Sequence, residues 1–253
     1  MRRLLKHFVI VLCVLLGRPP VASAIDYSFT TIDFPGALST SALGINNSGQ
    51  IVGSRQTTGD GGSTGFLFSG GSFTSIDFPA GAFSGGAWSI NDTGQIVGKY
   101  RACCGADGRG FLLSGGSFNT FDYPGAVGTA ATGINNAGEI VGSYQTNHVG
   151  PNHGFLISGG AFSTVDPPSS TETNVHSLNN SGQIVGAYRA GGTNHGFLRS
   201  GDSYSTIDFP EACCTVATGI NDIGQIVGYY GSSPNRGFWT WWFISLLRRS
   251  SLP

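Results

Sequence analysis

Residues 44–53 read Gly-Ile-Asn-Asn-Ser-Gly-Gln-Ile-Val-Gly, and this phrase decides the fold because close variants of it return four times. The variants occupy residues 89–98, 133–142, 177–186 and 219–228. Their closing glycines follow one another at intervals of 45, 44, 44 and 42 residues. A regular period of this length is typical of repeat architectures, and of propeller blades in particular.

Two further phrases recur in the same order within each period. Gly-Phe-Leu followed by an apolar residue and Ser-Gly-Gly begins at Gly65, Gly110 and Gly154, and returns in degraded form at Gly196 and Gly237. Variants of Thr-Ile-Asp-Phe-Pro are centred on five aspartates, for which we expect a structural, turn-bonding role: Asp33, Asp77, Asp122, Asp166 and Asp208. The asparagines that open the repeated turns are expected to be structural too: Asn46, Asn91, Asn135, Asn179 and Asn221.

Each period contains four short apolar runs separated by turn residues, which is the pattern of an antiparallel meander. In the first period, the first run ends at Ile45, and the other three occupy residues 50–54, 65–68 and 73–78. Pro79 ends the last run, because proline has no backbone N–H to donate to the neighbouring strand. The sequence therefore predicts an all-β, five-bladed β-propeller with four strands per blade. A linear β-solenoid and a fragment of a longer array are the alternatives.

The order of the runs also predicts how such a ring closes. A fourth-type run at residues 29–34 precedes the first full unit, whereas the fifth unit has three runs and no closing Ile-Asp-Phe-Pro. We expect the N-terminal strand to complete the last blade, because radial repeats avoid orphan edges in this way.

Composition excludes several classes of protein. The chain has 253 residues, 41 of them glycine, 40% hydrophobic residues and a formal net charge of −1. Disorder requires higher charge and fewer apolar residues, and collagen requires a Gly-X-Y period that is absent. The sequence has no stripe of basic residues of the kind that nucleic-acid-binding proteins show.

The N-terminus is typical of a secretory signal peptide. Arg2, Arg3 and Lys6 precede an apolar run at residues 8–17, and a small-residue site ends at Ala24. We predict a signal peptide over residues 1–24, a propeller over 25–238, an atypical tail over 239–253 and a secreted protein. A membrane anchor is the alternative, but the run is shorter than a bilayer span, so we expect no transmembrane span in the mature chain. Cleavage after Ala24 leaves nine basic and 14 acidic side chains, a net charge of −5.

The phrases Asn-His-Gly-Phe-Leu at residues 152–156 and 194–198, beside the Gly-Ile-Asn-Asn phrase, resemble the HAF-repeat family of extracellular bacterial proteins. The resemblance covers residues 29–238. It implies export and repetition and carries no established activity or catalytic residues. The chain departs from the pattern at Thr64, Arg109 and Arg236, which stand where the other repeats have histidine, and in its tail.

Unit-specific residues are the candidates for function. Second-to-third loops, such as residues 55–64, 101–109 and 145–153, vary while the other turns repeat, which is typical of a binding face on a rigid scaffold, although loops also drift without function. The position two before the repeated Ile or Leu of the first run also varies, and there we expect residues that line a channel or pack: Leu43, Trp88, Thr132, His176 and Thr218. The residues that precede Gly-Phe are further candidates for ligand contact: Arg109, His153, His195 and Arg236.

His153 and His195 occupy equivalent positions in different repeats, so they are expected to stand far apart. No cluster of His and Cys ligands supplies a closed site, and we predict no metal and no cofactor. Each histidine is instead expected to bond the backbone at a loop end.

The mature chain has two pairs of adjacent cysteines, Cys103-Cys104 and Cys213-Cys214. Adjacent cysteines lack the spacing of metal knuckles and redox sites. A bond between the two loops requires Cα atoms within about 7 Å, which separate blades disfavour. Strained bonds between neighbours and free thiols both stay open.

An enzyme would need an acid and a base. Of the unit-specific carboxylates, the sequence places Asp60, Asp107, Glu172 and Glu211 in long loops and none on an inner strand, where a glycosidase pair is best held. No nucleophile elbow or phosphate loop occurs. The tail, ten apolar-dominated residues followed by Arg248 and Arg249, is read as a partner-binding stripe or a frame-shifted end rather than an anchor.

The sequence thus predicts a secreted, non-catalytic binding or surface-structural module that uses its variable loop face to bind glycan or protein. The alternative is a glycoside hydrolase or lyase that acts on polysaccharide with the same scaffold. The sequence leaves the ligand and the oligomeric state open.

Overall fold

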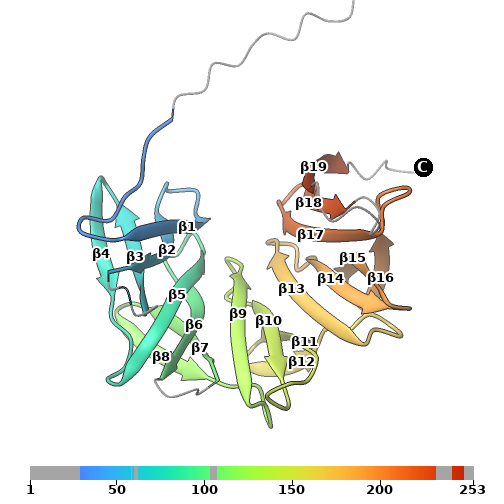
Figure 1. Cartoon of the computed structure of the whole chain (residues 1–253), viewed down its shortest axis with the longest axis horizontal. Coiled ribbons are helices and arrows are strands. Elements are labelled where there is room, and N and C mark those ends of the chain that lie inside the picture. The colour runs from blue at the N-terminus through green and yellow to red at the C-terminus, as the bar shows by residue number, and fades with distance from the viewer. Residues whose placement is uncertain (1–28, 58, 60–61, 103–106, 232–240, 248–253) are drawn as a thin grey trace, which may run out of the picture. The chain divides into compact units, whose positions relative to one another are not determined.

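Antiparallel β-sheets make up the described part of the chain (Figure 1). The computed structural model describes residues 29–57, 59, 62–102, 107–231 and 241–247, the last segment without its side chains. The chain divides into two units, Met1–Ile32 and Asp33–Pro253. Only residues 29–32 of the first unit are described, and they form no strand. All strands lie in the second unit, and its described residues contain no helix. The expected signal peptide lies outside the described residues.

Three of the sheets have four strands each, in the simple order of a meander. The first sheet consists of β1 (Ser39–Ile45), β2 (Ile51–Gln56), β3 (Ser63–Ser69) and β4 (Ser72–Ile76). The second sheet consists of β5 (Ala82–Ile90), β6 (Ile96–Ala102), β7 (Arg109–Ser114) and β8 (Ser117–Phe121). The third sheet consists of β9 (Gly128–Ile134), β10 (Ile140–Gln145), β11 (His153–Ser158) and β12 (Ala161–Thr164).

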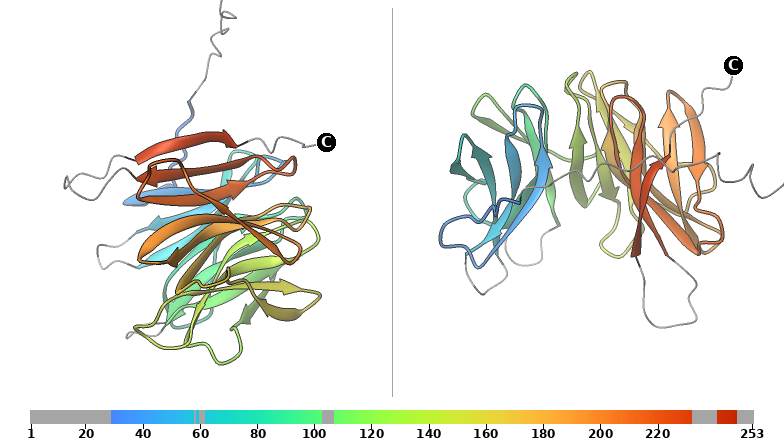
Figure 2. Two further views of the ribbon diagram at one scale, coloured as in Figure 1. Left: turned by 90° about the vertical axis from the view of Figure 1, so that its right-hand side faces the viewer. Right: turned by 90° about the horizontal axis from the view of Figure 1, so that it is seen from above.

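The fourth sheet is larger because it contains the last two sequence repeats. Its strands are β13 (Glu172–Leu178), β14 (Ile184–Ala190), β15 (Thr193–Ser200), β16 (Ser203–Ile207), β17 (Cys214–Ile220), β18 (Ile226–Gly231) and β19 (Trp241–Leu247). A parallel pair between Asn194 of β15 and Cys214 of β17 joins the two repeats into one seven-stranded sheet. Neighbouring sheets contact one another side by side as the blades of a β-propeller (Figure 2).

The propeller prediction is confirmed, but the predicted number of blades is wrong. The structure has four antiparallel-sheet blades and not five, because the parallel pair merges the fifth repeat with the fourth. The predicted closing strand at residues 29–34 is also wrong. The backbone N–H of Phe34 donates to Thr40 Oγ1 at 3.0 Å, and its carbonyl accepts from the N–H of Ala37 at 3.0 Å. Phe34 therefore lies in the turn that leads into β1, as Tyr123 and Phe209 do in later repeats, but residues 29–34 form no strand before it.

The third run of the fifth repeat, expected near Phe238, lies further along the chain. β19 spans Trp241–Leu247 and pairs antiparallel with β18. Part of the segment expected as an atypical tail is therefore a strand of the fourth sheet. Phe238 itself lies outside the described residues.

Local chemistry explains why the repeated phrase forms a hairpin. The Oδ1 atom of Asn46 accepts from the N–H groups of Ser48 and Gln50, at 3.1 and 3.0 Å, which closes an Asx turn. Gly49 has a φ of 73°, a left-handed conformation that glycine adopts without steric cost. The same asparagine contacts recur in the later turns, so each repeat carries its own hairpin signal.

The closing glycine of each phrase allows a close approach inside the sheet. Gly53 lies on β2, and a Cβ atom there would stand 1.9 Å from the Ser41 carbonyl oxygen and 2.8 Å from the Phe66 ring. Phe66 has no exposed surface. Glycine at this position therefore lets a buried aromatic ring pack against the backbone of the second strand.

The core lies between neighbouring sheets as much as within them. The repeated valine of each second strand packs into the apolar cluster of the next repeat, and these valines have no exposed surface: Val52, Val97, Val141 and Val185. Val227, the equivalent residue of the fifth repeat, is 48% exposed. At the other end of the array Ile45 is 67% exposed, whereas its equivalent Ile90 is 6% exposed. Within the part of the chain that the structure describes, the two ends of the array thus carry exposed repeat positions whose equivalents are buried against a neighbouring repeat.

Candidate functional site

The turns between first and second strands gather around one cavity of about 290 Å³. All five repeats contribute their Asn-Asn or Asn-Asp turn to its lining. The side-chain amide of each asparagine in the first four turns donates to the backbone carbonyl of the next turn: Asn46 to Asn91 at 3.1 Å, Asn91 to Asn135 at 2.9 Å, Asn135 to Asn179 at 3.2 Å and Asn179 to Asn221 at 3.0 Å. This ladder, which we call the asparagine ladder, ties the repeats together.

A second tier of bonds runs along the same turns. The side chain of Asp92 accepts from the backbone and side chain of Asn47 and from the side chain of Asn136. These hydrogen bonds, that from Asn136 first, lower the pKa of the Asp92 carboxyl. Asp222 accepts from Asn180 in the same manner. The acidic groups of this face are occupied by amide donors, which indicates a structural role.

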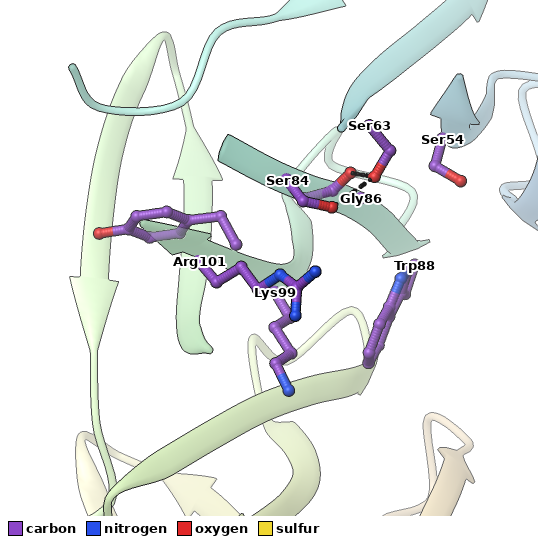
Figure 3. A pocket seen from close by; sticks show the side chains of 9 residues that line it. Ser54, Ser63, Ser84, Gly86, Trp88, Lys99 and Arg101 are labelled. Carbon is purple, nitrogen blue, oxygen red and sulfur yellow. Dashed lines mark hydrogen bonds between the residues drawn. The ribbon is translucent and has the colours of Figure 1, made fainter. Parts of the chain in front are cut away.

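A second group of cavities lies between neighbouring repeats, two of them between sheets and the third within the fourth sheet, between its two repeats. The first cavity has a volume of about 250 Å³, lies between the first and second sheets and is lined by Ser54, Ser63, Ser84, Trp88, Lys99 and Arg101 among others (Figure 3). The second, of about 230 Å³, shares Trp88 and Lys99 with the first and extends to Asn174 and His176. The third, of about 240 Å³, shares Asn174 and His176 with the second and adds Glu172 and Arg189. We call this series the inter-blade cleft.

Strand pairing places the residues of the first cavity on one face. Gly86 of β5 lies opposite Lys99 of β6, and Ser84 lies opposite Arg101. Trp88 lies at a bulge of β5, between Ala87 and Ser89, and a Cβ atom added at Gly86 would stand 3.1 Å from its Nε1, so the indole lies on the side of Gly86. One indole ring and two cationic side chains thus line the same cavity (Figure 3).

Burial sets the electrostatics of the inter-blade cleft. The pKa of the Lys99 amine is lowered, chiefly because burial disfavours its charged form, and the negative charge of Asp107 opposes this effect. The carboxylate of Asp107 also contacts Nδ1 of His148. Burial also lowers the pKa of His176, which favours its neutral ring.

A polar chain crosses the middle of the cleft. The amide of Asn152 donates to Asn174 Oδ1 at 2.6 Å, and the amide of Asn174 donates to Glu172 Oε1 at 3.2 Å. Glu172 is the first residue of the inner strand β13, so its expected place in a long loop is wrong. The position follows from its pairing with Arg189 of β14.

The structure separates the five candidates at the variable inner-strand position. Trp88, Thr132 and His176 line the inter-blade cleft. Thr132 also donates from Oγ1 to the carbonyl of Val175 at 2.9 Å, which links two sheets. Leu43 is half-exposed at the open end of the array, and Thr218 donates to the carbonyl of Val227. Neither Leu43 nor Thr218 lines any of the three cavities of the cleft.

The candidates before Gly-Phe pair with the repeated aspartates. Arg109 donates to Asp122 Oδ2 at 2.9 Å from Nε and 2.6 Å from a terminal nitrogen. The Nδ1 atom of His153 lies 3.0 Å from an Asp166 carboxylate oxygen, and that of His195 lies 2.9 Å from Asp208. Asp166 also accepts from the backbone N–H of Gly154 at 3.0 Å. The histidines thus bond a carboxylate rather than the expected backbone group. Arg236 lies outside the described residues.

The adjacent cysteines of the last repeat are free thiols in the structure, with their sulfur atoms 3.5 Å apart. The pKa of the Cys214 thiol is raised, first by burial and then by its contact with Cys213. Cys103 and Cys104 lie outside the described residues, as does Asp60. Among the residues with described side chains, no group of three or more His, Cys, Asp or Glu residues gathers as a metal site. The described part of the chain contains no helix long and apolar enough to cross a membrane.

Sequence reasoning missed Lys99, the residue that two cavities of the cleft share. The position after the closing glycine of each phrase holds Ser54, Lys99, Ser143, Ala187 and Tyr229. The residue type at this position varies between repeats, as it does at the position of Trp88. Comparison of the repeats therefore marks Lys99 as well. Asn152 and Asn174 carry no comparable signal, because only the packing of β13 beside the β10–β11 loop brings them together.

Comparison with known proteins identifies the scaffold. No family model matches the chain, and no curated protein matches it. Among solved structures, the β-propeller domain of the trilobed protease from Pyrococcus furiosus, which has an open velcro topology, is similar with a TM-score of 0.60 and 11% identity. The match covers 83% of this chain and 65% of that one. The acylaminoacyl peptidase of Pyrococcus horikoshii is similar with a TM-score of 0.52 and 12% identity, over 79% of this chain and 36% of the peptidase.

The chain thus spans less than two thirds of either protein. At these identities the likeness is one of fold, and it places the chain among β-propellers. It carries no peptidase activity over to this protein.

Proposed function

We propose that this chain is an exported, non-catalytic binding module whose ligand is a glycan and whose ligand site is the inter-blade cleft. The signal-like N-terminus and the resemblance to HAF repeats support export. The fold supports the role of a rigid scaffold, because the asparagine ladder and the interlocked valines connect successive repeats.

One observation carries the proposal. Trp88 lines two adjoining cavities that also contain hydroxyl, amide and imidazole groups. An apolar ring face beside a few convergent polar groups is the usual composition of a small-molecule site, and an indole ring suits the C–H face of a sugar.

The arrangement of carboxylates supports binding over hydrolysis. Glu172 is the one carboxylate among the described residues that line the three cavities. It is engaged by the amide of Asn174. Glycosidases use two carboxyl groups, about 5–9 Å apart, on either side of the scissile bond. Asp107, the other acid near the cleft, is paired with His148.

Binding and turnover should be measured on the same samples. The purified chain is titrated with neutral and acidic oligosaccharides by calorimetry, and each mixture is then analysed for cleavage products. Saturable binding without products is expected, as is its loss in Trp88→Ala. Leu43→Ala is the matched control, because Leu43 has the same repeat position outside the cleft. Cleavage products that disappear in Glu172→Gln would show that the chain is an enzyme instead. Binding that Trp88→Ala leaves unaffected would show that the ligand site lies outside the cleft.

A further inference from the structure

The cleft is electrically uneven along its length. Lys99 and Arg101 line the first cavity, and the described lining of that cavity contains no carboxylate. At the far end, Arg189 is accompanied by Glu172. A negatively charged group therefore has its best electrostatic position near Trp88, between the first and second sheets.

The position of Lys99 depends on a gap in the neighbouring backbone. A Cβ atom added at Gly108 would lie 1.6 Å from Lys99 Cε and 2.6 Å from its Cδ. The lysine stem therefore occupies space that only glycine leaves open. Such a groove orients the ammonium group and reduces the freedom that the side chain loses when it binds a ligand.

Among the described residues, Asp107 is the acid that acts on the charge of Lys99, and its carboxylate also contacts the ring of His148. Burial of the Lys99 amine lowers its pKa, so the charged form is incompletely compensated in the unliganded protein. An anionic ligand placed at the ammonium would supply that compensation.

Two serine hydroxyls of the first cavity, Ser63 on β3 of the first sheet and Ser84 on β5 of the second, are arranged as acceptors. Ser63 donates from Oγ to the carbonyl of Gly85 at 2.9 Å, and its Oγ lies 2.9 Å from Ser84 Oγ. Since the Ser63 proton goes to Gly85, Ser84 is the donor in the bond between them. Both oxygens keep lone pairs directed away from these bonds, and such lone pairs suit the hydroxyl donors of a sugar.

We infer that the cavity between the first and second sheets binds a uronic acid residue of an anionic polysaccharide. The sugar carboxylate pairs with Lys99 and Arg101, the ring packs on Trp88, and ring hydroxyls donate to Ser63 and Ser84. Adjacent sugars extend into the second cavity, which shares Trp88 and Lys99. This inference rests on the proposed glycan-binding function and specifies its ligand class.

The test compares trigalacturonate with its carboxyl-reduced, neutral counterpart by isothermal titration calorimetry on the full chain. Trigalacturonate is expected to bind about 10- to 100-fold more tightly, the range for one or two charge-assisted hydrogen bonds. Lys99→Met should remove most of that difference. Gly108→Ala should do the same by displacing the lysine stem. Arg199→Met is the charge-matched control, because Arg199 pairs with Asp202 away from the cleft. Thermal denaturation of each variant confirms that it is folded.

The outcomes separate this inference from the proposed function. If both sugars bind equally and depend on Trp88, the acidic class is wrong and the binding module stands. If neither sugar binds, both proposals are wrong. If trigalacturonate binds but retains its affinity in Lys99→Met, a different basic site is responsible and the inference is overturned.

Discussion

The side-chain amide of Asn91 donates to the backbone carbonyl of Asn135 on the neighbouring sheet, with a nitrogen–oxygen distance of 2.9 Å. The same side chain accepts from the N–H groups of Thr93 and Gln95 through Oδ1. One buried asparagine thus shapes its own hairpin and fixes the next one, which explains why the residue recurs in all five turns.

Removal of this amide should destabilise the fold, and the size of the effect should depend on position in the ladder. Asn91 is 4% exposed, so Asn91→Ala leaves buried partners without a bond and is expected to cost about 2–3 kcal/mol. Asn221, the last asparagine of the ladder, is exposed, and among the described contacts its side chain bonds only within its own turn, to Gln225. Asn221→Ala should cost about 1 kcal/mol or less. Urea unfolding of both variants measures the difference, and equal costs would contradict the ladder.

The uncovered ends of the array predict a second contrast between equivalent residues. Val97→Ala removes two buried methyl groups and should cost about 2 kcal/mol. Val227→Ala acts at the same repeat position on an exposed side chain and should cost well under about 1 kcal/mol. Denaturant midpoints of the two variants decide this. A large cost at Val227 would show that something covers the end of the array in solution.

The propeller was predictable because its signals are local and repeated. Asn46 and Gly49 specify the hairpin within a few residues, and five copies of that hairpin indicate a radial or linear array. The merging of the last two repeats was not predictable, because it depends on one parallel pair, Asn194 with Cys214, between residues whose types do not encode it. The expected closing strand at residues 29–34 is absent, and the bond from Phe34 N–H to the Thr40 hydroxyl does not explain this, because the equivalent bonds of Tyr123 and Phe209 follow the complete strands β8 and β16.

The candidate site was predictable where repeats could be compared. Trp88 and His176 differ from their equivalents in other repeats, and both line the inter-blade cleft. Lys99 differs from its equivalents too, and comparison at that position would have found it. The partners of the histidines were not predictable in the same way. His153 and Asp166 are 13 residues apart and meet only because antiparallel pairing of β11 with β12 brings their ends together.

The residue that precedes each Gly-Phe pairs with a repeated aspartate, and this contact predicts that arginine can replace histidine at that position. Arg109 bonds Asp122 at the position where His153 bonds Asp166, so His153→Arg should keep the contact and change stability by less than about 0.5 kcal/mol. His153→Ala should lose about 0.5–1 kcal/mol, a modest amount because the pair is partly exposed. Thermal denaturation of the two variants is the measurement. If the arginine variant is as unstable as the alanine variant, the repeated position does not serve as a partner for aspartate.

His176 predicts how stability depends on pH. Burial lowers its pKa in the folded protein below the ordinary value of 6.5, so the unfolded chain takes up the proton first as the pH falls. The stability that the neutral ring contributes is therefore complete above pH 6.5 and is lost progressively below it, down to the lowered folded pKa. Urea unfolding at a series of pH values from about 7.5 to about 5 should show this decline. His176→Asn should flatten it. A decline that persists unchanged in His176→Asn would assign the pH dependence to other groups.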